Sequence, residues 1–246
     1  SKYINLMYKD NLKMKKIRWI INLLLLIILL FSSYKIINKF IQYNKADKVY
    51  DKIYKIKESQ QNNNDNSVDL SYLNKDYRGW LDVDGTNIHY PIVQSSNNEF
   101  YLNKDMDKNY LESGSIFLDY QNDKFNDFNT VLYGHSMRNG TMFGQLKKFK
   151  DEEFFNKYKT ISISEPDGTV LNYTIFSAYV TDSSNVYNKT SFASNEDFNN
   201  FLSKIKKDSL FKSSVNVDST DKILTLSTCS YEFDNARMVV HAKLNK

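Results

Sequence analysis

Apolar and polar residues follow a different pattern in each part of this chain. Residues 19–34 read WIINLLLLIILLFSSY and carry no charged side chain. As a helix, this stretch would be about 24 Å long, and its extension to Ile37 would reach roughly 28 Å. A bilayer has a hydrocarbon core of about 30 Å, and Lys35 can extend its ammonium group to the interface. The pattern therefore predicts a transmembrane anchor at residues 19–37.

The residues on either side of the apolar stretch distinguish an anchor from a cleaved signal peptide, which begins in the same way. No A-x-A-like cleavage site follows, and SSYKIINKFIQYN continues in a helical pattern, so we favour an uncleaved anchor. Residues 1–18 contain six basic residues and one acidic residue, a net charge of +5. The positive-inside rule then predicts a cytoplasmic tail at 1–18 and a single-pass protein of the cell membrane, with everything after about residue 38 outside.

A second, amphipathic pattern follows the apolar stretch. Between 38 and 61, apolar residues recur among Lys, Asp and Gln residues at a spacing typical of a surface helix. The polar run QNNNDNS at 61–67 is the best candidate for a boundary, and LSYLNKDY at 70–77 is expected to form a short helix. We therefore expect a helical stalk or linker at 38–66 and an extracellular folded domain at 67–246.

From Gly79 onward, the pattern changes to short runs rich in β-branched and aromatic residues, which are typical of strands. Asp84-Gly85 and Pro166-Asp167-Gly168 have the composition of tight turns between successive runs. Eight runs are expected to be strands, at 80–83, 87–93, 115–119, 130–134, 160–164, 169–180, 222–229 and 237–244.

One clear helix interrupts these runs. In SNEDFNNFLSKIKKDSL, Ser194 or Asn195 can cap a helix whose apolar residues lie at i, i+3, i+4 and i+7 from Phe198. A further amphipathic helical stretch is expected around 143–158. Eight mostly antiparallel strands favour a closed barrel, because closure removes exposed strand edges. The predicted fold class is mainly β: an eight-stranded β-barrel with N-terminal helices and a helix before the seventh strand.

Composition narrows the classes of function. The 246 residues carry a formal charge of +4, of which the tail contributes +5, so the rest of the chain sums to −1. The folded part has no overall basic bias toward nucleic acid, and no such partner is expected. The single cysteine, Cys229, excludes an intramolecular disulfide. The sequence has no zinc motif and no Gly-rich phosphate motif, so we expect neither a metal site nor a cofactor.

Three side chains at strand ends carry the candidate chemistry. His135 follows the run TVLYG, Cys229 ends KILTLSTC, and Arg237 opens the last run. Antiparallel pairing of the last two runs would bring Arg237 beside Cys229. A thiolate can attack a carbonyl, an imidazolium can protonate the leaving amine and a guanidinium can stabilise negative charge, so the three types suggest acyl transfer. His89 and His241 lie inside strands, where a structural role is favoured.

The alternation of side chains along a strand adds one more candidate. With a period of two, Thr225, Ser227 and Cys229 share one face of their strand. Ser227 is therefore placed to reach a substrate or the thiol. The alternative for Ser227 is a hydroxyl whose hydrogen bonds are satisfied within the fold.

Four segments resemble motifs of one enzyme family. TLSTC followed by Arg237, eight residues after Cys229, resembles the signature of the sortases. TVLYGHSMRNGTMFGQLKKF resembles the His-bearing segment of class B sortases. GWLDVDGTNIHYPIVQSSNNEFYL and SGSIFLDY resemble the first hairpin and the third strand of that class. The resemblance covers about residues 70–244, and the anchor and the helix before the seventh strand also fit it.

The resemblance implies a cysteine transpeptidase that needs no cofactor. Cys229 would be the nucleophile, His135 the general acid and base, and Arg237 the group that stabilises the oxyanion or positions the substrate. Such an enzyme cleaves a C-terminal sorting signal on a surface protein after Thr, forms a thioacyl-enzyme, and transfers the protein to a peptide amine of cell-wall peptidoglycan. The substrate groove would be lined by Asn98, Leu102, Ser183, Tyr187 and Ser227.

Two other functions stay open on the sequence alone. A membrane-anchored cysteine peptidase would let water resolve the thioester, although neither C-G-S-C-W nor Q-A-C-x-G occurs here. A non-catalytic, membrane-tethered binding module would leave Cys229 buried. Ser230 stands where some sortases have an acidic residue, so the side of the site that receives the second substrate is not defined by the resemblance.

Overall fold

The computed structural model describes residues 2–61, 68–230 and 232–246. The polar run expected to separate the stalk from the domain lies, except for its first residue, outside the described residues. The chain divides into two compact units, residues 1–45 and residues 46–246. The second unit begins within the first helix and contains every strand.

Helix α1 (Lys2–Gln61) includes both the expected anchor and the expected stalk. Its part from Lys13 to Gln60 contains a stretch with a mean hydropathy of 2.3, long and apolar enough to cross a membrane, and the side chains of that stretch are exposed. α1 is therefore a candidate membrane anchor. Its last turns belong to the second unit, where Ile53 is buried and the Lys57 ammonium lies 4.7 Å from the centroid of the Trp80 ring.

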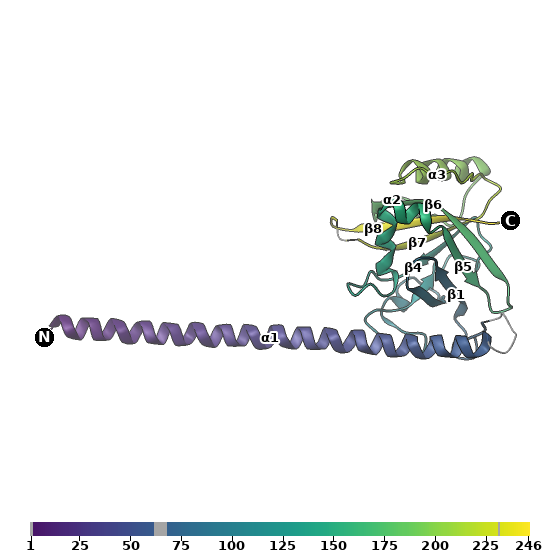
Figure 1. The fold of residues 1–246 in the computed structure, drawn as a ribbon. Helices are drawn as coiled ribbons and strands as arrows, with labels where there is room; N and C mark the ends of the chain where they lie inside the picture. The colour runs from purple at the N-terminus through teal and green to yellow at the C-terminus, as the bar shows by residue number, and fades with distance from the viewer. Residues whose placement is uncertain (1, 62–67, 231) are drawn as a thin grey trace. The chain divides into compact units, whose positions relative to one another are not determined.

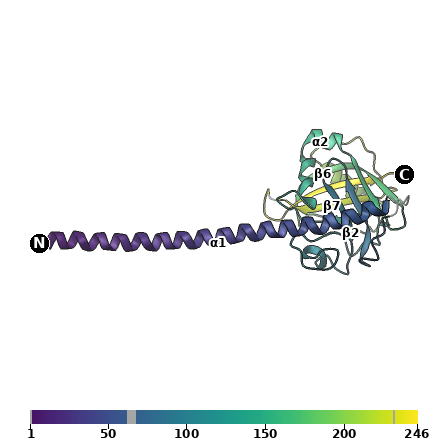
Figure 2. The ribbon, with the colours of Figure 1, turned by 60° about the horizontal axis from the view of Figure 1, so that its bottom comes forward.

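Eight strands form a closed barrel in the order β1-β2-β3-β4-β7-β8-β6-β5 (Figures 1 and 2). This confirms the predicted fold class. Six of the eight pairings are antiparallel, whereas β2 with β3 and β4 with β7 are parallel. The strands are β1 (Tyr77–Val83), β2 (Ile88–Val93), β3 (Ile116–Leu118), β4 (Asn129–Tyr133), β5 (Thr160–Ser164), β6 (Val170–Asp182), β7 (Ile223–Cys229) and β8 (Ala236–Leu244).

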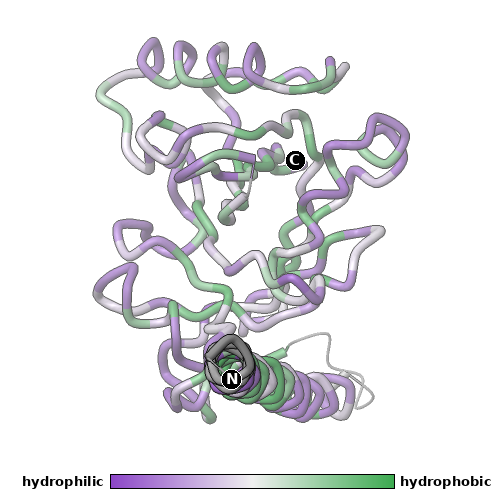
Figure 3. Tube along the Cα trace, turned by 90° about the vertical axis from the view of Figure 1, so that its left-hand side faces the viewer, coloured by the Kyte–Doolittle hydropathy of each residue, from purple (hydrophilic) through white to green (hydrophobic). Residues whose placement is uncertain are grey.

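Apart from the last turns of α1, the helices of the second unit are short except for α3. α3 (Asn195–Lys207) precedes β7, as predicted, and Ser194 caps it by accepting a hydrogen bond from the Asp197 amide. Hydrophobic and hydrophilic residues alternate along α3, at the top of Figure 3. The stretch expected around 143–158 is two helices, the 3-10 helix η2 (Phe143–Lys150) and α2 (Glu152–Lys157). They are separate because Asp151 is extended and caps α2.

The expected helix at 70–77 was wrong. The chain forms a turn there, and β1 already begins at Tyr77. The reason is the buried side chain of Asn74, whose Oδ1 accepts from the Asp76 amide at 2.9 Å and whose Nδ2 donates to the Met106 carbonyl at 2.7 Å. A side chain that satisfies the backbone in this way competes with helix formation. The same Nδ2 also donates to a hydroxyl of the 3-10 helix η1 (Phe100–Asn103), which lies next to this turn.

Alternation along β7 and β8 separates two hydrophobic layers. Leu224 and Leu226 pack in the main core together with residues of β1 to β5. Ile223 and Val239 instead pack against Phe198 and other residues of α3. Side chains two residues apart on a strand share a face, so the outer side of the barrel carries Thr225, Ser227 and Cys229 together with Ile223. The candidate site is thus built on the outer face of the barrel.

Candidate active site

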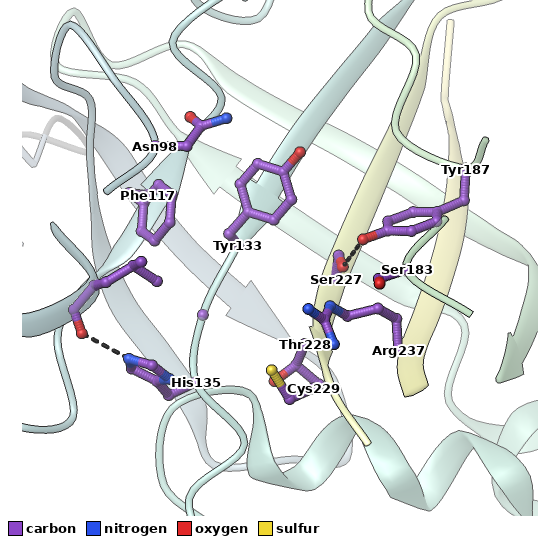
Figure 4. A pocket seen from close by; sticks show the side chains of 12 residues that line it. Asn98, Phe117, Tyr133, His135, Ser183, Tyr187, Ser227, Thr228, Cys229 and Arg237 are labelled. Carbon is purple, nitrogen blue, oxygen red and sulfur yellow. Dashed lines mark hydrogen bonds between the residues drawn. The ribbon is translucent and has the colours of Figure 1, made fainter. Parts of the chain in front are cut away.

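A cavity of about 340 Å³ opens at the ends of β4 and β7. It contains all eight residues that the sequence singled out for a site. They come from β7 and β8 and from the segments that follow β2, β4 and β6 (Figure 4). The cavity is lined by Asn98, Leu102, Phe117, Tyr133, Gly134, His135, Ser183, Tyr187, Ser227, Thr228, Cys229 and Arg237.

The pairing of β7 with β8 places a thiol beside a guanidinium. Cys229 is the last residue of β7, and its partner in the antiparallel register is Arg237. The Cys229 side chain is exposed. Arg237 donates from Nη1 to the carbonyl of Ala236 at 3.0 Å and to that of Asn235 at 3.2 Å. These bonds hold the guanidinium at the strand end, where Figure 4 shows it next to the sulfur.

His135 is placed by the parallel pairing of β4 with β7. Tyr133 is the register partner of Ser227, and the next amide, that of Gly134, donates to the Ser227 carbonyl at 3.3 Å. His135 comes two residues after Tyr133, and Cys229 comes two residues after Ser227. The two strands therefore deliver an imidazole and a thiol to the same end of the barrel.

A hydrogen bond to the backbone fixes the His135 ring. Its Nε2 lies 2.6 Å from the carbonyl oxygen of Leu102, in η1 (Figure 4). A carbonyl only accepts, so Nε2 carries the hydrogen and Nδ1 is the nitrogen left for proton exchange. The Leu102 carbonyl lies close to Gly114, which has a φ of +58° and on which a Cβ would lie 2.5 Å from the Leu102 oxygen.

The wall on the β3 and β4 side is fixed by Asp119. Its Oδ2 accepts from Asn98 Nδ2 at 3.0 Å and from the Tyr133 hydroxyl at 2.9 Å. Asn188 also donates to the Tyr133 oxygen, at 2.8 Å. Burial raises the pKa of Tyr133 above its ordinary value, so this phenol stays neutral. Asn98 is consequently locked in place, with Asp119 and the Tyr120 amide as partners.

The opposite wall comes from the long segment after β6. Tyr187 is buried, and its hydroxyl accepts from Ser227 Oγ at 3.2 Å. Ser183 is exposed at the rim, and its amide donates to the Asn235 carbonyl at 3.0 Å. The serine that the strand pattern placed on the thiol's face thus lies in the cavity, but its hydroxyl is engaged with Tyr187.

The other two histidines lie away from the cavity. His89 is exposed on β2, and its Nδ1 lies 2.7 Å from Asp82 Oδ1. His241 is fully buried on β8, with Nδ1 2.8 Å from the Thr225 hydroxyl and Nε2 3.0 Å from the Tyr179 hydroxyl. Both have structural partners inside or on the barrel.

Four cavity residues were not singled out from the sequence: Phe117, Tyr133, Gly134 and Thr228. Tyr133 and Gly134 directly precede His135, and Thr228 directly precedes Cys229, so proximity in the sequence was the available signal. The Thr228 hydroxyl is buried and has no hydrogen-bond partner within the described part of the chain. Among the described residues, no group of three or more His, Cys, Asp or Glu side chains is arranged to hold a metal ion.

Comparisons with known proteins identify the family. The Sortase domain model matches residues 81–245. Sortase B of Staphylococcus aureus (strain NCTC 8325 / PS 47) is 34% identical over 243 residues, which are 96% of this chain and 99% of that protein. Sortase B of Listeria monocytogenes serovar 1/2a is 41% identical over 179 residues, which are 72% of each protein.

Similarity extends to the three-dimensional structure. The solved Staphylococcus aureus sortase B–substrate complex matches with a TM-score of 0.77 at 33% identity, over 84% of this chain and 99% of that chain. The fold, the order of the motifs and the relatives therefore agree, and the chain belongs to the sortase family of cysteine transpeptidases, within class B.

Proposed function

We propose that this sortase cleaves a C-terminal sorting signal after Thr and transfers the protein to a peptide amine of the cell wall. One observation carries the proposal: a single open cavity is lined by an exposed cysteine, an imidazole and a guanidinium. A solved sortase B is described with its substrate, and another, 34% identical over 82% of this chain, is complexed with triglycine. A peptide substrate and a peptide amine are therefore the classes of reactant that we assign.

In the first half of the reaction, the Cys229 thiolate attacks the carbonyl of the signal's Thr. The C–N bond breaks, and His135, as imidazolium, gives its proton to the departing amine. Arg237 donates hydrogen bonds to the oxygen that becomes negative, or to the substrate backbone next to it. The products are a thioester on Cys229 and a neutral His135.

In the second half, a neutral amine attacks the thioester carbonyl. The C–S bond breaks, the amide forms, and the proton released by the amine passes to His135. This restores the thiolate and the imidazolium, so no cofactor is consumed. The five residues assigned to the groove, Asn98, Leu102, Ser183, Tyr187 and Ser227, would hold the signal while both steps occur.

The candidate membrane helix in α1 supports a membrane arrangement as well. We assign residues 19–37 to the transmembrane anchor, the basic residues 1–18 to the cytoplasmic side, and the linker at 38–66 and the domain at 67–246 to the outside. The +5 charge of the tail supports this orientation. Signals on exported proteins would then meet the cavity on the same side of the membrane as the cell wall.

The test is cleavage and ligation by the purified full-length protein in detergent. A library of pentapeptide signals is incubated with and without an amine acceptor, and products are identified by mass spectrometry. We expect a ligated product with the wild type and neither cleavage nor ligation with Cys229→Ala. Cleavage without any ligated product would favour the peptidase, and cleavage by Cys229→Ala near the wild-type rate would exclude the thioacyl mechanism.

A further inference from the structure

Cys229 lies between two cavities. A second cavity of about 310 Å³ shares Thr228 and Cys229 with the first and continues on the other side of the thiol. The first cavity contains Arg237 and His135, whereas the second is lined by two lysines of η2 and by Ser230 and Glu232 of the segment after β7. If the first cavity holds the signal, the second offers a separate approach to the thioester.

An ion pair closes part of the second cavity. The Lys150 ammonium, at the end of η2, contacts the Glu232 carboxylate, and the Ser230 hydroxyl donates to the same carboxylate. Both charged side chains are 37% exposed. The hydrogen bond from Lys150, and then that from Ser230, lowers the pKa of Glu232 to about 2. Glu232 is therefore a carboxylate at neutral pH.

Lys150, the ion-pair partner of Glu232, carries the same functional group as an acceptor amine. Lys150 carries a primary ammonium on a flexible aliphatic chain, and it occupies a cavity that ends at the nucleophile. An acceptor amine is also a primary ammonium in solution and must reach the same sulfur. The pair is exposed enough for exchange, because an ion pair of this kind contributes only about 1 kcal/mol or less.

We propose that Glu232 is the positioning residue for the acceptor: the acceptor's primary ammonium displaces Lys150 from Glu232 in the second cavity before it attacks the thioester. This inference rests on the proposed function, and it adds the location of the second substrate and the residue that selects its charge. Lys150 then competes with the acceptor and covers the thioester until an amine arrives.

The proton balance of this step is complete. The bound ammonium loses one proton to solvent and becomes the nucleophile. It attacks the thioester carbon, the C–N bond forms and the C–S bond breaks, and its second proton goes to the neutral His135. Glu232 accepts no proton, which fits its strong preference for the carboxylate form. After release of the amide, Lys150 returns to Glu232.

The experiment compares full-length wild type with Glu232→Gln in detergent, using one cleavable signal peptide and two acceptors. Nα-acetyl-lysine amide presents a side-chain amine, and triglycine presents an N-terminal amine. We expect Glu232→Gln to form the thioacyl-enzyme at the wild-type rate but to raise the acceptor KM roughly fivefold. Glu232→Asp should recover part of this loss, and Asp234→Asn, a neutralised carboxylate in the same segment, should not change KM. The acceptor with the lower wild-type KM identifies the source of the amine.

The variant Lys150→Met shows whether Lys150 competes with the acceptor for Glu232 or only supports the segment after β7. If Lys150 competes with the acceptor, its removal lowers the acceptor KM; if the ion pair only shapes the loop, Lys150→Met raises KM as Glu232→Gln does, and the inference is overturned. An unchanged KM in Glu232→Gln, or an equal loss in thioacyl formation, also overturns it.

A second readout requires no turnover. Either acceptor at millimolar concentration should slow iodoacetamide alkylation of Cys229 in the wild type but not in Glu232→Gln. Protection without any ligation would leave the acceptor site in place and contradict the proposed function alone. Absence of protection in the wild type would contradict the acceptor site itself.

Discussion

The buried histidine of β8 makes a quantitative prediction about stability and pH. The Thr225 hydroxyl donates its hydrogen to Asn129 Oδ1 at 2.7 Å, so His241 Nδ1 must donate to Thr225. His241 Nε2 then accepts from the Tyr179 hydroxyl, at 3.0 Å. Every polar atom of a neutral ring is thereby satisfied. We consider the substitution His241→Gln, which removes the titrating group and retains a donor and an acceptor.

The magnitude follows from the two pKa values. Burial, and secondarily the charge of Lys204, lowers the pKa of His241 to about 3 in the folded protein, whereas an unfolded histidine has a pKa of about 6.5. Between these values the unfolded state binds one more proton, so stability is complete above about pH 6.5 and falls as pH decreases toward 3. The slope is about 1.4 kcal/mol per pH unit, which makes the loss at pH 5 about 2 kcal/mol relative to pH 8.

The assay is urea unfolding of the full-length protein in detergent, followed by near-UV circular dichroism at several pH values from 8 to 5. Packing changes will shift the free energy of unfolding of His241→Gln at every pH. From pH 8 to pH 5, however, we expect the variant to lose about 2 kcal/mol less than the wild type. Phe201→Leu is the control, because Phe201 packs against the His241 ring and the substitution keeps the histidine. Parallel curves for the wild type and His241→Gln would refute the assignment of a neutral His241.

The other predictions concern activity. Arg237→Lys should lose roughly 10²–10³ in kcat, because an ammonium cannot reproduce the planar fork; full activity would reduce Arg237 to a generic positive charge. His135→Ala should almost abolish formation of the thioacyl-enzyme, measured by mass spectrometry after an acid quench, whereas His89→Ala should keep most of it. Normal thioacyl formation in His135→Ala would contradict the role of His135 as the acid. Gly114→Ala should lower both the melting temperature and kcat, because its Cβ would displace the Leu102 oxygen that holds His135; wild-type values for both would show that the turn adapts without disturbing His135.

Local sequence patterns predicted the elements of this fold well. The run TISIS coincides with β5, and the spacing from Phe198 coincides with a buried helix face, since both depend only on which side chains face the core. The helix expected at 70–77 failed because Asn74 binds partners that are distant in the sequence. Periodicity cannot show such partners. For the same reason it could not show that β4 pairs with β7 in parallel.

The sequence indicated the residues of the first cavity beside Cys229 but not the ion pair of the second. Alternation along β7 placed Ser227 on the face of the thiol, positions at strand ends marked His135 and Arg237, and motif resemblance supplied the other groove residues; all of them line one cavity. The engagement of Ser227 by Tyr187 was not predictable, because Tyr187 comes from a long segment with no repeating pattern. Lys150 and Glu232 were missed as well. Single charged residues in polar segments carry no signal until folding brings them together.

The parallel pairing of β4 with β7 also determines when the cavity around Cys229 is assembled during folding. β4 ends at Tyr133 and β7 begins at Ile223, so the contact between them closes a long loop, which carries a large entropic cost and is slow to form. Arg237 follows Cys229 by only eight residues, so their pairing closes a short loop at a small entropic cost. The thiol therefore meets His135 only when β4 and β7 pair. Because both strands belong to the closed barrel, the complete set of cavity side chains is assembled only in a chain whose barrel has closed.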